Sequence, residues 1–97
     1  MKIEKNLNGS EAVLAMEGRL DTTTAPELEA EIKSLTGIET LILDMKGLEY
    51  LSSAGLRVLL AAQKTMNTQG KMIVKNVNET IMEVFEITGF ADILTIE

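Results

Sequence analysis

The sequence predicts an α/β domain whose sheet is mixed but largely parallel, and three observations support this fold class. Short apolar runs typical of strands alternate with longer segments in which apolar residues recur at helical spacing. Glycine, asparagine and serine separate these segments, and proline occurs once, at Pro26. A chain of 97 residues is the size of one domain. We therefore expect residues 1–97 to form a single unit in the order β-β-α-β-α-β-α-β.

The predicted strands begin with a hairpin and continue as three single strands. Residues 2–7 and 12–17 flank the turn Asn8-Gly9-Ser10. The run Leu41-Ile42-Leu43 ends at Asp44 and is compact and apolar, as expected for a strand that is buried on both faces. The last two predicted strands share this apolar character and cover residues 71–75 and 93–96.

Three helices are predicted between these strands. The first begins at Thr24, three residues before Glu27, a spacing that lets each side chain accept the other's backbone N–H. Pro26 falls in the first turn, where its missing N–H costs little. The second helix covers about residues 54–68, and the third runs from about Asn78 to Gly89. Strands alternating with helices of this length predict crossover connections between parallel strands.

The composition argues against several classes of function. The chain has no cysteine and no histidine, so it has no thiolate nucleophile, no histidine-based triad and no zinc site of the usual kind. The net charge is −6 and the nine basic residues are scattered, which disfavours binding to nucleic acid. The sequence contains neither a phosphate-binding glycine motif nor a run of about 20 apolar residues. We expect a cytoplasmic protein without membrane insertion, cofactor, metal or catalytic residues.

Two segments follow predicted strands at their carboxyl ends, where ligands of parallel sheets usually bind. They are residues 18–24 and residues 45–56, and both are expected at the same edge of the sheet. Either Ser52 or Ser53 must occupy the N-cap of the second helix. One interpretation is a purely structural cap. The other is a phosphorylation site, because a phosphate at the positive end of a helix would be tolerated by the fold but not by a partner covering it.

The stretches LILDMKGLEYLSSAGLRVLL and GRLDTTTAPELE together resemble the hallmarks of STAS domains, and specifically the free-standing anti-sigma factor antagonists of bacteria. The resemblance covers essentially the whole chain. It implies Ser53 as the phosphate acceptor, with Ser52 as the second candidate, and matches Asp21 and Asp44 to two recurrent aspartates. The family usually has Asp where this chain has Ser52, and Ser or Thr where it has Ala54.

The resemblance further implies a partner switch that regulates transcription. The unphosphorylated protein would bind an anti-sigma factor, a serine kinase with the fold of histidine-kinase ATPases, and release it once phosphorylated. A PP2C-type phosphatase would reset the switch. The expected switch and partner-binding residues are Asp21, Thr22, Asp44, Tyr50, Ser52, Ser53, Ala54, Gly55, Leu56 and Arg57. The alternative is a constitutive STAS subunit of a larger complex, such as a lipid transporter or a signalling assembly, without a phosphoswitch.

Overall fold

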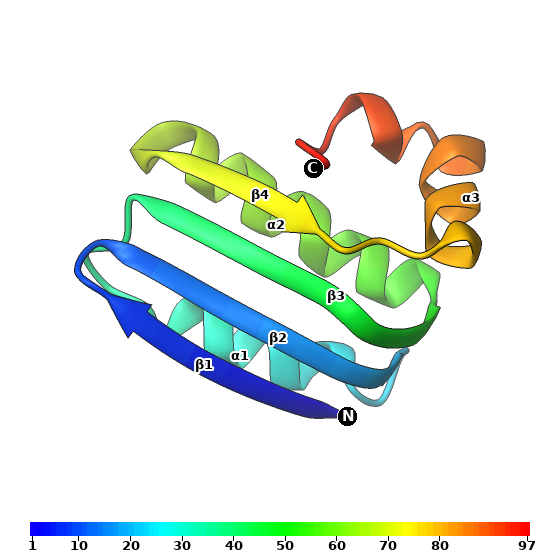
Figure 1. Ribbon diagram of the computed structural model, residues 1–97, viewed down its shortest axis with the longest axis horizontal. Helices are drawn as coiled ribbons and strands as arrows, with labels where there is room; N and C mark the ends of the chain where they lie inside the picture. The colour runs from blue at the N-terminus through cyan, green and yellow to red at the C-terminus, as the bar shows by residue number, and fades with distance from the viewer.

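The computed structural model describes residues 1–97 and contains one four-stranded sheet and three helices (Figure 1). A single turn of 3₁₀ helix covers Phe90–Asp92. In chain order, the elements are β1 (Lys2–Asn8), β2 (Glu11–Leu20), α1 (Ala25–Lys33), β3 (Thr40–Leu51), α2 (Ser53–Gln69), β4 (Lys71–Lys75) and α3 (Glu79–Thr88). No helix is both long and apolar enough to cross a lipid bilayer.

The sheet has the order β1-β2-β3-β4 and is mixed, as predicted. β1 and β2 form an antiparallel hairpin around Gly9, whose φ of 63° suits the tight turn. The pairs β2–β3 and β3–β4 are parallel. In the register of the first parallel pair, Leu20 lies opposite Leu51, so β2 and β3 end at the same edge of the sheet. This confirms that the two segments singled out in the sequence share one edge.

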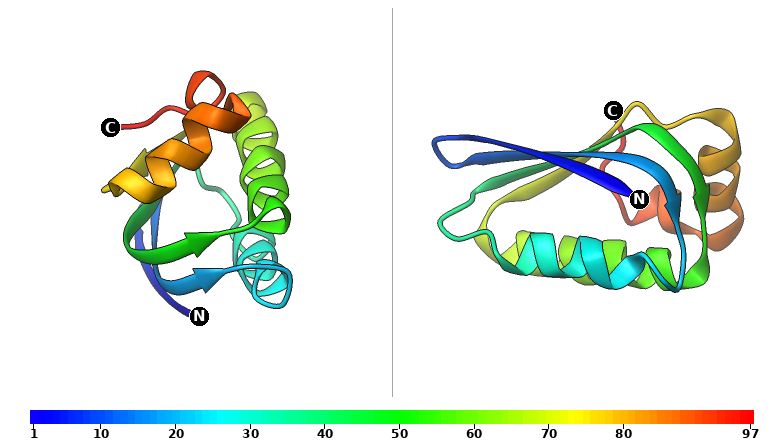
Figure 2. Two further views of the ribbon diagram at one scale, coloured as in Figure 1. Left: turned by 90° about the vertical axis from the view of Figure 1, so that its right-hand side faces the viewer. Right: turned by 90° about the horizontal axis from the view of Figure 1, so that it is seen from below.

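The molecule has two layers, because α1 and α2 lie side by side against one face of the sheet while the other face stays open (Figure 2). α3 lies at the end of the sheet, beyond the last residues of β4 (Figure 1). Burial alternates along β3: Leu41, Leu43 and Met45 are buried, whereas Ile42 and Asp44 on the open face are only partly covered. The expectation that this strand is buried on both faces is therefore wrong. The reason is that α1 and α2, the helices of the two crossover connections, both pack on the opposite face (Figure 2).

The strands extend into both of the segments that follow them in the predicted fold. β3 continues through Lys46 and Glu49 to Leu51, and only Ser52 separates it from α2. β2 likewise continues to Leu20, with irregular pairing between Ala15 and Arg19. Pairing between these two strands outweighs the local signal of a loop, because each strand supplies the other's backbone partners.

The last predicted strand is reduced to a single bridge between Val74 and Ile96. Val74 N–H donates to the Thr95 carbonyl at 2.8 Å, and Val74 C=O accepts from Glu97 N–H at 2.9 Å. The preceding residues turn helically: Leu94 N–H donates to the Phe90 carbonyl at 2.9 Å, and the Leu94 side chain is buried. These helical bonds use backbone groups that a full edge strand would need.

Candidate functional site

The two strand ends meet at what we call the carboxyl edge, formed by residues 19–24 and 49–57. Leu20 C=O accepts a hydrogen bond from Ser52 N–H at 2.9 Å, which joins the end of β2 to the start of α2. The Arg19 guanidinium carbon lies 4.1 Å from the centre of the Tyr50 ring, a cation–π contact between neighbouring strand residues. Tyr50 is 41% exposed, so part of its ring faces solvent.

Ser52 is the N-cap of α2. Its backbone is extended, with φ −98° and ψ 174°, and its Oγ accepts a hydrogen bond from Gly55 N–H at 3.4 Å. This side chain satisfies one of the N–H groups that the first turn of a helix leaves without a partner. The structural interpretation of the serine pair therefore applies to Ser52.

Ser53 is the first residue of α2, and its environment differs from that of Ser52. The residue is exposed, and its hydroxyl makes no hydrogen bond within the chain. It lies at the positive end of a helix of 17 residues, beside N–H groups that have no intrahelical acceptor. The geometry thus leaves a free hydroxyl at Ser53 and an engaged one at Ser52.

Gly55 allows α2 to begin directly on the strand ends. A Cβ atom at this position would lie 2.7 Å from Leu20 Cγ and 2.7 Å from Leu51 Cδ1. Leu56, the next residue, is also buried. These two members of the expected switch set lie beneath the surface and support the helix start. Ala54 is partly covered, and Arg57 is exposed.

Asp21 organises the turn between β2 and α1. Its Oδ1 accepts hydrogen bonds from Thr23 N–H at 3.0 Å, Thr24 N–H at 3.2 Å and the Thr23 hydroxyl at 2.8 Å. These donors, the Thr23 hydroxyl foremost, lower the pKa of the Asp21 carboxyl. Thr22 is exposed at the tip of this turn.

The predicted reciprocal cap between Thr24 and Glu27 is wrong. Thr24 is the N-cap residue of α1 but already has helical angles, φ −100° and ψ −20°. Its hydroxyl points back to the strand: it accepts from Asp21 N–H at 2.8 Å and donates to the Arg19 carbonyl at 2.7 Å. Asp21 therefore accepts the Thr24 N–H that Glu27 was expected to satisfy, and the Glu27 N–H donates to the Thr24 carbonyl at 2.9 Å.

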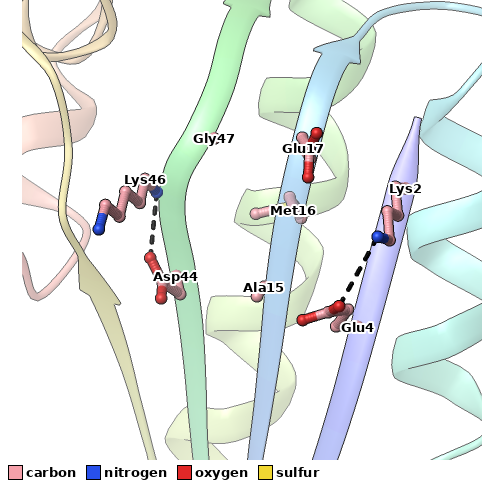
Figure 3. Close-up of a pocket in the computed structure, with 8 residues that line it drawn as sticks. All are labelled: Lys2, Glu4, Ala15, Met16, Glu17, Asp44, Lys46 and Gly47. Carbon is pink, nitrogen blue, oxygen red and sulfur yellow. Dashed lines mark hydrogen bonds and ion pairs between the residues drawn. The ribbon is translucent and has the colours of Figure 1, made fainter.

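Asp44 lies away from the carboxyl edge, on the open face of the sheet. Its Oδ1 accepts from Asn76 Nδ2 and from Lys46 N–H, both at 3.0 Å. The Asn76 amide, ahead of the Lys46 N–H, lowers the pKa of the Asp44 carboxyl. Asp44 lines a hollow of about 390 Å³ together with Lys2, Glu17 and other residues of the open face (Figure 3). No group of three or more acidic side chains in the structure could hold a metal ion.

Asn78 is a linking residue that the sequence identified only as a helix start. Its Oδ1 accepts from Ile81 N–H at 2.9 Å and so caps α3. Its Nδ2 donates to the Leu48 carbonyl, also at 2.9 Å, across 30 positions of sequence. Asparagine before an apolar helical pattern signals the cap. The second bond has no local sequence signal because it depends on where α3 meets β3.

The family model described as STAS domain matches residues 2–97. BtrV of Bordetella bronchiseptica, whose name assigns it provisionally to the anti-sigma factor antagonists, is 33% identical over 99% of this chain and 85% of its own length. The anti-sigma-B factor antagonist of Staphylococcus aureus is 30% identical over 79% of this chain and 74% of its own length.

Solved structures show the same fold at lower identity. The anti-sigma factor antagonist SpoIIAA in its unphosphorylated form superposes with a TM-score of 0.85 at 19% identity, over 99% of this chain and 88% of its own. The phosphorylated form of SpoIIAA, described as a Bacillus cell fate determinant, gives a TM-score of 0.78 at 19% identity, over 99% of this chain and 91% of its own. With a family model that spans nearly every residue and a fold that agrees, the chain belongs to the STAS domain family.

Proposed function

We propose that this protein is an anti-sigma factor antagonist that works as a partner switch, with Ser53 as its phosphate acceptor. The observation that carries the proposal is the contrast between the two serines: Ser52 caps α2, whereas Ser53 presents a free hydroxyl on the carboxyl edge. The similarity to relatives named as antagonists of anti-sigma factors supports the same role. The unphosphorylated protein binds an anti-sigma factor in the cytoplasm and thereby frees a sigma factor. The protein itself catalyses nothing.

The switch step is a phosphoryl transfer from ATP, catalysed by the bound anti-sigma factor acting as a serine kinase. The Ser53 Oγ forms a bond to the γ-phosphorus, the bond from that phosphorus to the bridging oxygen breaks, and ADP leaves. The hydroxyl proton passes to a base of the kinase. A PP2C-type phosphatase reverses the state: water attacks the phosphorus, inorganic phosphate leaves, and the serine oxygen regains a proton.

The phosphate acts on association because of where Ser53 lies. A phosphoserine carries about −1.5 to −2 charges at neutral pH. The helix start tolerates this charge, since its N–H groups and dipole favour anions. A partner that covers the carboxyl edge must instead remove water from a dianion, which is costly. Around Ser53, Thr22, Tyr50 and Arg57 are exposed and are the side chains we assign to partner contact.

Affinity capture from lysate of the native bacterium tests the proposal. The baits are the wild-type protein, Ser53→Ala and wild type phosphorylated at Ser53, with Ser52→Ala as the matched control. We expect a kinase-like ATPase to be retained by every unphosphorylated bait and lost from the phosphorylated one. The captured kinase with ATP should phosphorylate wild type and Ser52→Ala but not Ser53→Ala. Equal retention by phosphorylated and unphosphorylated baits would overturn the switch.

A constitutive subunit of a larger complex is the second candidate. It is favoured by Ser52 and Ala54, which stand where the resembled antagonists usually have Asp and a hydroxyl residue. On this hypothesis Ser53 has no regulatory role, and a transporter or signalling partner copurifies with every bait regardless of phosphate. The same capture experiment therefore separates the two functions.

A further inference from the structure

Arg57 lies one helical turn after Ser53, so the two residues are related as i and i+4 on α2. Side chains with this spacing share a face of the helix. Helical side chains also lean toward the helix N-terminus, so that a long side chain covers the turn that precedes it. The turn that Arg57 covers is the first turn of α2, which begins with Ser53.

The Arg57 guanidinium is exposed and forms no ion pair, since the four ion pairs of the structure involve other residues. Arg19, the other arginine of the carboxyl edge, is already engaged, with its Nε 3.8 Å from Asp21 Oδ2 and its guanidinium over Tyr50. Arg57 is therefore the arginine of this edge that has no partner in the unphosphorylated protein.

The surroundings leave the guanidinium room to move. Arg57 borders a hollow of about 230 Å³ between the first turns of α1 and α2, which Thr22, Pro26 and Ala54 also line. The one acidic residue of this hollow, Glu29, pairs with Lys33 at 3.6 Å. No carboxylate in the hollow thus holds Arg57 away from Ser53.

We propose that Arg57 is the internal counter-ion of phosphoserine at position 53; this rests on the proposed function, which supplies the phosphate. The planar guanidinium can donate two parallel hydrogen bonds to phosphate oxygens. Phosphorylation then changes the carboxyl edge twice: it adds a dianion, and it withdraws an exposed cation that an acidic side chain of a partner would otherwise contact. An aspartate at position 53 is a poor mimic of this state, because it carries one charge on a shorter side chain.

The test uses protein into which phosphoserine is incorporated at position 53 during synthesis, so that no kinase is needed. The pH titration of its ³¹P NMR signal is compared between wild type and Arg57→Gln. We expect the phosphate dianion of wild type to bind a proton about three-fold more weakly than that of Arg57→Gln, because the guanidinium stabilises the dianion. Arg57→Lys should restore part of this difference, since lysine keeps the charge but lacks the two-pronged geometry.

Lys64→Gln is the matched control, because it removes one positive charge from the same helix at a position about 16 Å from Ser53 along the helix axis. Unphosphorylated Arg57→Gln should keep the melting temperature of wild type, which shows that it folds. Equal titrations of wild type and Arg57→Gln, or equal effects of Arg57→Gln and Lys64→Gln, would overturn the proposal. If the capture experiment finds no kinase, the proposed function fails, but this titration is unaffected because the phosphoserine is incorporated during synthesis. The two proposals can therefore fail separately.

Discussion

The stability of the fold should depend on the hydroxyl of Ser52 but not on that of Ser53. In Ser52→Ala, α2 loses the side-chain acceptor for Gly55 N–H. The backbone bond from Ser52 N–H to the Leu20 carbonyl remains, so the strand end stays in place. In Ser53→Ala, no hydrogen bond within the chain is lost. The first change should lower the stability of the fold, and the second should leave it nearly unchanged.

The expected magnitude follows from the length of the cap bond. Removing a serine N-cap costs about 0.5–2 kcal/mol. The Oγ···N distance of 3.4 Å is long for a hydrogen bond. We therefore expect a loss of about 0.5–1 kcal/mol for Ser52→Ala, at the lower end of that range. For a domain of this size, this loss lowers the melting temperature by about 3–6 °C. Ser53→Ala should stay within about 0.5 kcal/mol of wild type, as exposed positions usually do.

Urea and thermal unfolding followed by circular dichroism measure both variants under the same conditions. Ser52→Asp is the control, because aspartate is an equally good N-cap and its charge favours the helix N-terminus. It should match or exceed the stability of wild type. If Ser53→Ala loses as much stability as Ser52→Ala, or if Ser52→Asp fails to restore what alanine removes, the division of roles between the two serines is refuted.

Three further outcomes test contacts that hold the fold together. Asn78→Ala should lower the free energy of unfolding in urea by about 2 kcal/mol, because it removes both the α3 cap and the bond to the Leu48 carbonyl. Asn78→Asp should keep the cap and recover about half of this free energy. Full recovery would show that the bond to Leu48 contributes nothing. Gly70→Ala should lower the free energy of unfolding by about 3 kcal/mol, since the new Cβ would overlap the Glu39 carbonyl oxygen. Unchanged stability would mean that the backbone at this position moves freely. Asp44→Asn should flatten the fall of stability on acidification. The pKa of this carboxyl is lowered in the folded state, so its contribution to the free energy of unfolding is complete above the pKa of the unfolded chain, about 3.9. That contribution is lost as the pH falls through the pKa of the folded state. If wild type and Asp44→Asn show the same slope of unfolding free energy between about pH 4 and 2.5, this prediction is contradicted.

The sequence predicted the order of strands and helices up to α3 because its signals are local. The hairpin depends on glycine in a two-residue turn, and the third helix on Asn78 before it and Gly89 after it, where φ is 81°. The end of the chain was different. Residues 93–96 have the apolar character of a strand, yet Leu94 turns into the core and only Ile96 pairs with β4. Which of these groups binds a neighbouring strand depends on where α3 directs the chain.

The candidate site shows the same division. Its residue types, and the placement of two segments at one sheet edge, follow from the sequence, because the carboxyl ends of parallel strands point to the same edge of the sheet. Tertiary structure decided the roles within that edge: Ser52 became the cap and Ser53 stayed free, since β3 continues to Leu51 and fixes where α2 begins. Tertiary structure also placed Asp44 on the open face, beside Asn76. Local pattern determined which elements form, and contacts between distant segments determined which side chains remain available for chemistry.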